Sequence, residues 1–176
     1  YLPSRQGNTL SDRSAKHVLK HIDKNYKEYS FLQRGSDERQ YCSPGVDLPI
    51  ASVMRSKYGE YPEYHTSLDN LELVTKSGLK GSFDVYKKIL TVIEKNFVLK
   101  TLMLCEPKMD KRGLYPTLSD GSEYEWGVQE ALDILAYSDG NNDLLEIAEM
   151  MNINFEQIVQ IAETLVNEGL LIKEMD

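Results

Sequence analysis

The chain has few cysteines and no long apolar run, so its sequence matches neither disulfide-stabilised nor membrane-spanning proteins. Its 176 residues include two cysteines, Cys42 and Cys105, and no Cys-x-x-Cys pair. Two cysteines alone make neither a disulfide framework nor a zinc knuckle, which favours a cytoplasmic location. No apolar run approaches the roughly 20 residues that a membrane-spanning helix needs. We therefore expect no membrane partner.

Basic residues are almost absent from the last third of the chain. From Glu123 to the end there are 13 acidic residues and a single base, Lys173, whereas the preceding part has 15 acids and 19 bases. The formal net charge of −8 thus combines a mildly basic first part with a strongly acidic tail. Proteins that bind DNA neutralise phosphates with several cations, so the tail predicts no nucleic-acid partner.

The remaining composition is that of a packed protein, with 41% hydrophobic residues. Pro107, Gly113 and Pro116 interrupt the chain and indicate a linker. We expect a first domain at residues 1–104, a linker at 105–121 and a second domain at 122–176. The chain begins at Tyr1 without a Met, so we also expect a fragment of a longer protein.

The first domain has the pattern of an α/β protein. Ser11 can cap a helix that begins at Asp12, and an apolar stripe predicts a second helix over residues 77–96 that covers a sheet. Residues 29–32 and 48–54 are predicted strands, and residues 98–105 are expected to form a strand or an extended linker.

The tail has the spacing of three short helices followed by a strand. A capping box of Ser122 and Glu125 opens the first helix, and Asn154 caps the third. Gly169 ends the third helix, and residues 170–172 begin a strand. This order predicts a small winged helix-turn-helix domain.

Candidate functional residues gather in two polar runs on either side of the predicted 48–54 strand. His65 is followed four residues later by Asp69, which suits a metal ligand and its orienting carboxylate. The spacing alone suits an ordinary polar loop histidine better. Asp69 could equally cap the helix that follows. The upstream run places Asp37, Glu38 and Arg39 at a strand end, where substrate-binding loops lie; the same run also contains ordinary turn residues.

The two runs, GSDERQYCSPGVDLP (residues 35–49) and YGEYPEYHTSLDN (residues 58–70), resemble the zinc aminopeptidases and the related glutaminyl cyclases. The similarity is strongest to an aminopeptidase-like family linked to polysaccharide biosynthesis that carries a C-terminal winged helix. It implies the C-terminal portion of a mixed-sheet zinc aminopeptidase-like fold. It also implies that His65 is a Zn²⁺ ligand and that Tyr64 is a catalytic oxyanion donor. In many relatives a His follows the Ser-Asp pair, whereas here it is Glu38.

The resemblance implies hydrolysis of an amide near a free amino group, in a peptide or an amino-sugar-like substrate. Arg39 would hold a substrate carboxylate through a two-pronged contact. The general base and the other metal ligands would lie upstream of this chain. Two alternatives remain open. One is amidotransfer or cyclisation with the same metal. The other is a non-catalytic scaffold whose acidic winged domain binds a protein partner, forms a homo-oligomer or docks on the first domain.

Overall fold

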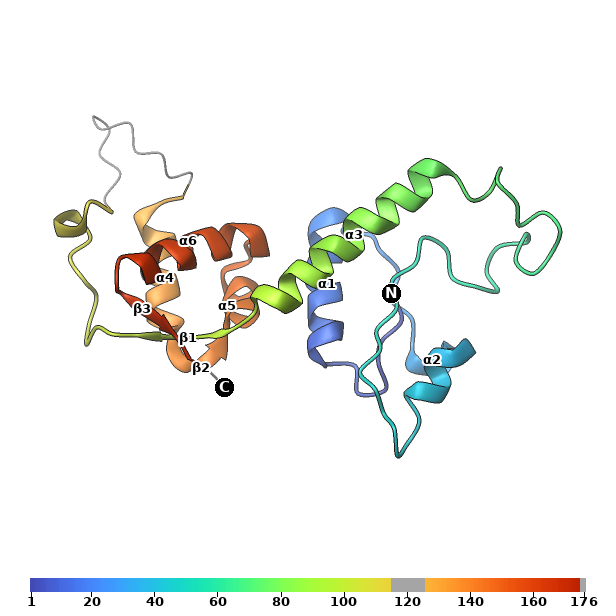
Figure 1. Cartoon of the computed structure of the whole chain (residues 1–176), viewed down its shortest axis with the longest axis horizontal. Helices are drawn as coiled ribbons and strands as arrows, with labels where there is room; N and C mark the ends of the chain where they lie inside the picture. Colours follow the sequence, from blue (N-terminus) through green and yellow to red (C-terminus); the bar gives the residue numbers. More distant parts are fainter. Residues whose placement is uncertain (115–125, 175–176) are drawn as a thin grey trace. The chain divides into compact units, whose positions relative to one another are not determined.

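The computed structural model describes residues 1–114 and 126–174, which divide into two compact units, Tyr1–Glu94 and Lys95–Asp176 (Figure 1). Among these described residues, no helix combines the length and the apolar character needed to cross a bilayer. Helices and a small three-stranded antiparallel sheet make up the regular structure.

The first helix of the first unit is α1 (Leu10–Ile22). The buried carboxylate of Asp12 binds the segment that leads into this helix. Thr9, and not Ser11 as predicted, is the N-cap, and it forms a capping box with Asp12. The fully buried Asp12 carboxylate accepts hydrogen bonds from Tyr1 Oη at 2.6 Å, Ser4 N at 2.8 Å and Thr9 Oγ1 at 2.6 Å. Burial raises the Asp12 pKa, but hydrogen bonds from Ser4, Thr9 and Tyr1 outweigh it and lower the pKa.

The predicted strands of the first unit are wrong. Residues 29–32 run into a 3₁₀ turn, η1 (Phe31–Gln33), and residues 48–54 are irregular apart from one isolated bridge between Leu2 and Ser52. The polar run after Gly35 forms a short helix, α2 (Ser36–Tyr41), where a loop was expected. A strand needs a partner with unpaired backbone groups, and Leu2 is the one residue bridged to residues 48–54 among those described.

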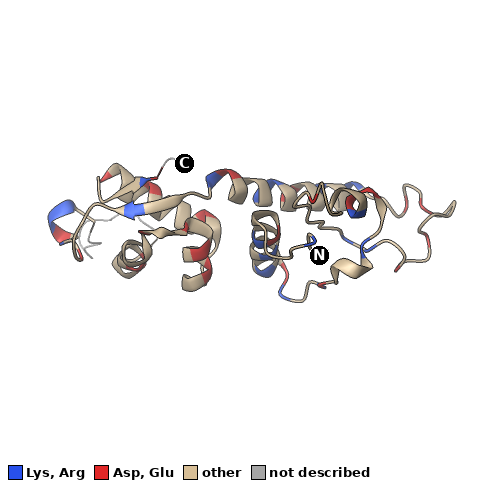
Figure 2. Cartoon of the chain, turned by 90° about the horizontal axis from the view of Figure 1, so that it is seen from below, with Lys and Arg blue, Asp and Glu red and all other residues tan. Residues whose placement is uncertain are grey.

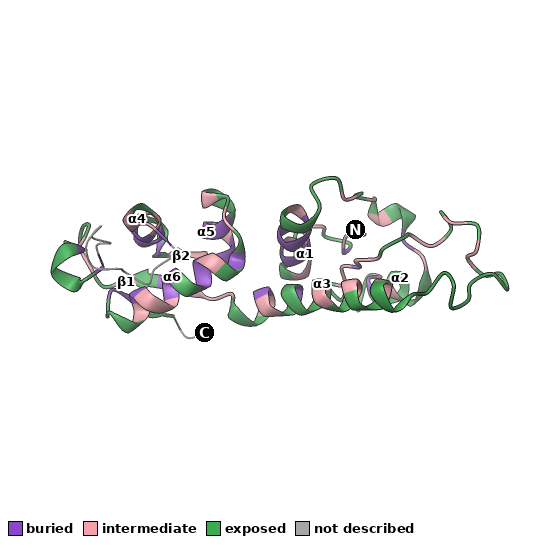
Figure 3. Ribbon diagram, turned by 90° about the horizontal axis from the view of Figure 1, so that it is seen from above, coloured by how far each residue is buried: buried purple, intermediate pink, exposed green. Residues whose placement is uncertain are grey.

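The helix predicted at residues 77–96 is confirmed as α3 (Lys76–Lys95), but its apolar stripe is not covered within the described residues. Leu79, Phe83 and Leu90 are 61%, 67% and 57% exposed, whereas only Ile89 and Val92 are buried. Figure 3 shows α3 largely in the colours of exposed and intermediate residues. The first unit contains no sheet among its described residues, so this helix has none to cover.

The second unit is a winged helix-turn-helix, as predicted. Its sheet has the order β2-β1-β3 and consists of β1 (Val98–Thr101), β2 (Asp139–Asp143) and β3 (Leu171–Lys173). Three helices pack with it, namely α4 (Val128–Tyr137), α5 (Leu144–Met151) and α6 (Phe155–Asn167), and a 3₁₀ turn, η2 (Asp110–Arg112), precedes them. Most of the apolar helix positions are fully buried, including Ile134, Ile147, Ile158 and Leu165.

Local signals in the tail identified most of these elements. Asn154 caps α6 by accepting a hydrogen bond from Gln157 N at 2.9 Å, and Gly169 has a φ of +67° where the chain leaves the helix. The Ser122–Glu125 capping box lies outside the described residues. Residues 98–101 were assigned to the first domain from sequence; as β1 they pair with both other strands of the second unit.

Candidate functional site

The His65 segment is a chain of consecutive turns with an unusual backbone at the histidine itself. His65 has a φ of +59°, a left-handed conformation that costs most residues about 1–2 kcal/mol. The turns are closed by hydrogen bonds from Tyr64 N to Tyr61 O at 3.3 Å and from Thr66 N to Glu63 O at 3.0 Å. Strained backbone of this kind is concentrated at functional sites.

The His65 side chain is exposed and lies flat against its neighbour. The rings of Tyr64 and His65 are stacked, with centroids 4.0 Å apart and planes inclined by 17°. Tyr61 meets Tyr64 edge-on at 5.6 Å. Within the described residues, neither imidazole nitrogen of His65 takes part in a hydrogen bond or ion pair. Stacking thus fixes the ring while its nitrogens remain available.

The fold joins the two polar runs through a third tyrosine. Tyr58 Oη accepts a hydrogen bond of 2.6 Å from Gly35 N, directly before α2. Tyr58 and Tyr64 also lie ring to ring, with centroids 6.3 Å apart. The sequence indicated both runs but not this link, because nothing distinguishes Tyr58 from the other tyrosines of its loop.

The predicted substrate-binding residues all lie on α2. Asp37 and Arg39 are exposed, and Arg39 Nη1 donates to the main-chain oxygen of Arg34 at 3.1 Å. Glu38 is half-buried, with Oε2 enclosed and without a hydrogen-bond partner among the described residues. No described hydrogen bond or ion pair connects these three side chains to His65.

Asp69 is exposed and makes no hydrogen bond to His65 among the described residues. Its charge does affect a neighbouring ring, since desolvation and then the Asp69 carboxylate raise the pKa of the Tyr61 phenol. The helix cap that Asp69 could have supplied comes from Thr75, whose Oγ1 accepts from Gly78 N at 3.1 Å. The role of Asp69 in orienting His65 stays a prediction.

Arg34 is a buried arginine that the sequence did not single out. The residue is 3% exposed, and its guanidinium donates to Leu2 O at 2.9 Å, Pro3 O at 3.0 Å and Ser52 Oγ at 2.9 Å. It therefore ties the first residues of the chain to the segment after α2 and supports the frame around the two polar runs.

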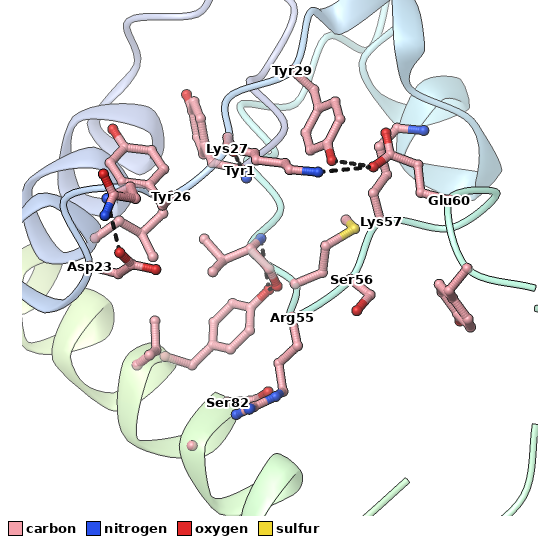
Figure 4. A pocket seen from close by; sticks show the side chains of 18 residues that line it. Tyr1, Asp23, Tyr26, Lys27, Tyr29, Arg55, Ser56, Lys57, Glu60 and Ser82 are labelled. Carbon is pink, nitrogen blue, oxygen red and sulfur yellow. Dashed lines mark hydrogen bonds and ion pairs between the residues drawn. The ribbon is translucent and has the colours of Figure 1, made fainter. Parts of the chain in front are cut away.

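A cavity of about 450 Å³ lies in the first unit, and Tyr61, which contacts Tyr64, is part of its wall. Figure 4 shows the side chains that surround it. Among its lining residues are five tyrosines and five charged residues: Tyr1, Tyr26, Tyr29, Tyr61 and Tyr86, and Asp23, Lys27, Arg55, Lys57 and Glu60. Its size falls in the usual range for small-ligand pockets, roughly 300–1,000 Å³.

The described residues contain no group of three or more His, Cys, Asp or Glu side chains that could hold a metal ion. A catalytic zinc ion usually has three protein ligands and a water. The described residues therefore supply at most part of such a centre, and the two ring nitrogens of His65 are available to it.

Comparison with known proteins divides the chain into two parts, at nearly the same residue as the structure does. A model of the domain of unknown function DUF4910 matches residues 1–96, and a winged helix-turn-helix model matches residues 97–173. A protein of Clostridium acetobutylicum, named as a proposed polysaccharide biosynthesis protein with an aminopeptidase-like domain, is 38% identical over 172 residues. The alignment covers 97% of this chain and 39% of that protein.

A crystal structure of a proposed peptidase from Clostridium acetobutylicum is also similar, with a TM-score of 0.84 and 35% identity. The match covers 98% of this chain and 38% of that one. The chain thus spans well under half the length of these relatives. With the DUF4910 model extending over more than half of its residues, the chain belongs to the DUF4910 family and carries a winged helix-turn-helix unit after that domain.

Proposed function

We propose that the chain is the C-terminal part of a zinc-dependent aminopeptidase-like hydrolase and that His65 is one of its metal ligands. The observation that carries the proposal is the state of His65: strained backbone, exposed ring, stacking on Tyr64 and available nitrogens. The names of the two Clostridium relatives, an aminopeptidase-like protein and a proposed peptidase, support the same class of reaction.

The donor chemistry fits zinc, because a neutral imidazole is one of its common ligands. When bound, zinc would polarise the substrate carbonyl and lower the pKa of a water molecule. His65 would bind the ion through one nitrogen, and its stacking on Tyr64 would limit rotation of the ring. Tyr64 would donate a hydrogen bond from its phenolic O–H to the oxyanion that forms at the carbonyl.

The finer fold proposal is that α3 of the first unit covers a mixed sheet supplied by the rest of the protein. The exposed stripe of α3 supports it, since three large apolar side chains, Leu79, Phe83 and Leu90, would be costly to leave in water. The relatives are long enough to contain the missing layer, because this chain covers only 39% and 38% of them.

For the substrate, we propose an amide bond in a peptide or an amino-sugar-like compound, with polysaccharide biosynthesis as the setting that the relative's name suggests. The winged unit would contact a basic protein surface and not nucleic acid. The exposed face of α6 carries Glu156 and Glu163, and acidic residues are spread over the helices of the unit (Figure 2). Such a surface repels a polyanion.

Metal analysis of the full-length protein tests the central proposal. Purified His65→Ala should retain much less zinc than the parent, because loss of one ligand removes a large part of the affinity. The matched control is His21→Ala, which removes an exposed histidine of α1 and should leave the zinc content unchanged. Equal zinc content in the parent and His65→Ala would favour the non-catalytic scaffold.

A further inference from the structure

Arg55, on the wall of the tyrosine-lined cavity, lies in a notch of α3 that is made by two glycines. A Cβ atom built on Gly81 would come within 2.7 Å of Arg55 Nη1, and one built on Gly78 would lie 3.8 Å from Arg55 Cδ and Nε. Figure 4 shows the Arg55 side chain extending to α3 beside Ser82. The guanidinium therefore packs against bare helix backbone.

Glycine inside a helix costs about 1 kcal/mol relative to alanine. At Gly81 the structure shows why glycine is present despite this cost: any side chain there would displace the Arg55 guanidinium. Gly78 and Gly81 lie three residues apart and so share a face of α3. The glycine face of α3 thus gives the exposed Arg55 side chain a surface to lie against, which reduces part of the entropy that this long side chain would lose on binding a ligand.

Within the described residues, Arg55 has no hydrogen-bond or ion-pair partner, whereas the carboxylates of the cavity are already engaged. Glu60 Oε2 accepts from Tyr29 Oη at 2.6 Å and lies 3.9 Å from Lys27 Nζ. Asp23 Oδ1 accepts from Asn25 N at 2.9 Å. Arg55 is thus an exposed cation on the wall of the cavity, against α3, whose charge no described carboxylate neutralises.

The other two bases of the cavity differ from Arg55. Lys27 is paired with Glu60, and Lys57 Nζ donates to Tyr58 O at 3.2 Å and lies 4.7 Å from the centre of the Tyr58 ring. A guanidinium offers a planar pair of N–H donors that matches a carboxylate. The cavity therefore combines aromatic walls with one available two-pronged anion donor.

Ring contacts connect this cavity to His65. Tyr61 lines the cavity and meets Tyr64 at 5.6 Å between centroids, and Tyr64 is stacked on His65 at 4.0 Å.

We propose that this cavity is a substrate subsite in which Arg55 binds the free carboxylate of a short peptide, with the adjoining side chain against the tyrosines. This inference rests on the proposed hydrolase function and specifies its substrate class. Arg55 takes the role that the sequence had suggested for Arg39, whose guanidinium donates to the Arg34 carbonyl.

Calorimetric titration of the full-length protein in chelator tests the subsite without metal. The probes are the tripeptide Ala-Ala-Phe, its C-terminal amide, and inorganic phosphate. The parent should bind the free acid about tenfold or more tightly than the amide, as expected for a charge-assisted hydrogen-bonded pair. Arg55→Gln and Gly81→Ala should abolish this preference.

Gly78→Ala is the matched control, because its Cβ would lie at ordinary contact distance, 3.8 Å, from Arg55 and should preserve the preference. Its Cβ would also come within 3.2 Å of Thr75 Oγ1, so the α3 helix content of this variant is checked by circular dichroism. Equal binding of acid and amide by the parent, or a preference that persists in Arg55→Gln, overturns the subsite. Binding of phosphate but not of the free acid also overturns it. Zinc content is measured on the same samples. A normal zinc content with no acid preference refutes the subsite alone, and a retained preference with no dependence of zinc on His65 refutes only the metal proposal.

Discussion

Replacing His65 by glycine separates the strain at this residue from its proposed role as a ligand. Glycine relieves the left-handed backbone, at φ +59°, which is worth about 1–2 kcal/mol. It also adds flexibility to the unfolded chain, which costs about 0.5–1 kcal/mol, and loses the stack on Tyr64, worth about 0.5–1.5 kcal/mol. These effects nearly cancel, so in chelator the free energy of unfolding should change by less than about 1 kcal/mol.

Zinc should break this balance. A ligand at 100 times its dissociation constant stabilises the folded state by about 2.7 kcal/mol. The parent should gain roughly that amount from zinc, whereas His65→Gly should gain little, because its site lacks one ligand. The assay is denaturant unfolding of the full-length protein with chelator and with zinc, for parent and variant.

Ser36→Gly is the matched control for this experiment, since Ser36 also has a φ of +59°. It should gain the same backbone relief and respond to zinc like the parent. If zinc stabilises His65→Gly as much as the parent, His65 is not a ligand. A loss of more than about 2 kcal/mol in chelator would show instead that the backbone reasoning is wrong.

Three further predictions follow from other parts of the chain. Tyr64→Phe should lower kcat by about 10²–10³ with little change in KM, if its phenol serves the oxyanion; steady-state kinetics with a peptide substrate would show this, and unchanged kcat would reduce Tyr64 to packing. Asp12→Asn should cost about 2–4 kcal/mol of unfolding free energy, because it removes buried charge-assisted hydrogen bonds. The control Asp84→Asn changes a half-exposed side chain that pairs with Lys80 at the surface, and it should cost about 0.5 kcal/mol or less. Because folding lowers the Asp12 pKa, this stabilisation is present above the unfolded pKa of about 3.9 and is lost as the pH falls through the folded value; a parent and variant that unfold identically at neutral pH would contradict it. The full-length protein should give no mobility shift with duplex DNA at micromolar concentration near 0.15 M salt, given 13 acids and one base from Glu123 onward; a submicromolar, sequence-dependent shift would restore a DNA-binding role.

The winged unit could be predicted from sequence because its signals are local. The Asn154 cap, the Gly169 turn and the helical spacing of apolar residues act over a few residues and are all present in the structure. The pairing of β1 could not be predicted, because the sequence of a four-residue strand does not indicate which other strands it pairs with. Its membership of the winged sheet is a tertiary fact.

The first unit shows the opposite balance. Apolar runs at residues 29–32 and 48–54 suited strands, but a strand exists only where another segment supplies hydrogen bonds, and residues 48–54 are bridged only to Leu2 among the described residues. Likewise, periodicity located α3 but could not show that Phe83 and its neighbours are exposed. Burial depends on what packs against a helix, and this chain covers only part of its relatives.

At the candidate site, the sequence by itself indicated the candidate residues, and the tertiary structure decided how they are arranged. Residue types placed His65 and Asp69 in a polar loop, and the resemblance of residues 58–70 to the zinc aminopeptidases marked His65 as a metal ligand and Tyr64 as an oxyanion donor. The hydrogen bond between Gly35 and Tyr58 and the contact between Arg55 and Gly81 each join residues more than twenty positions apart. Such contacts leave no periodic signal, and only the folded chain brings these groups within bonding distance.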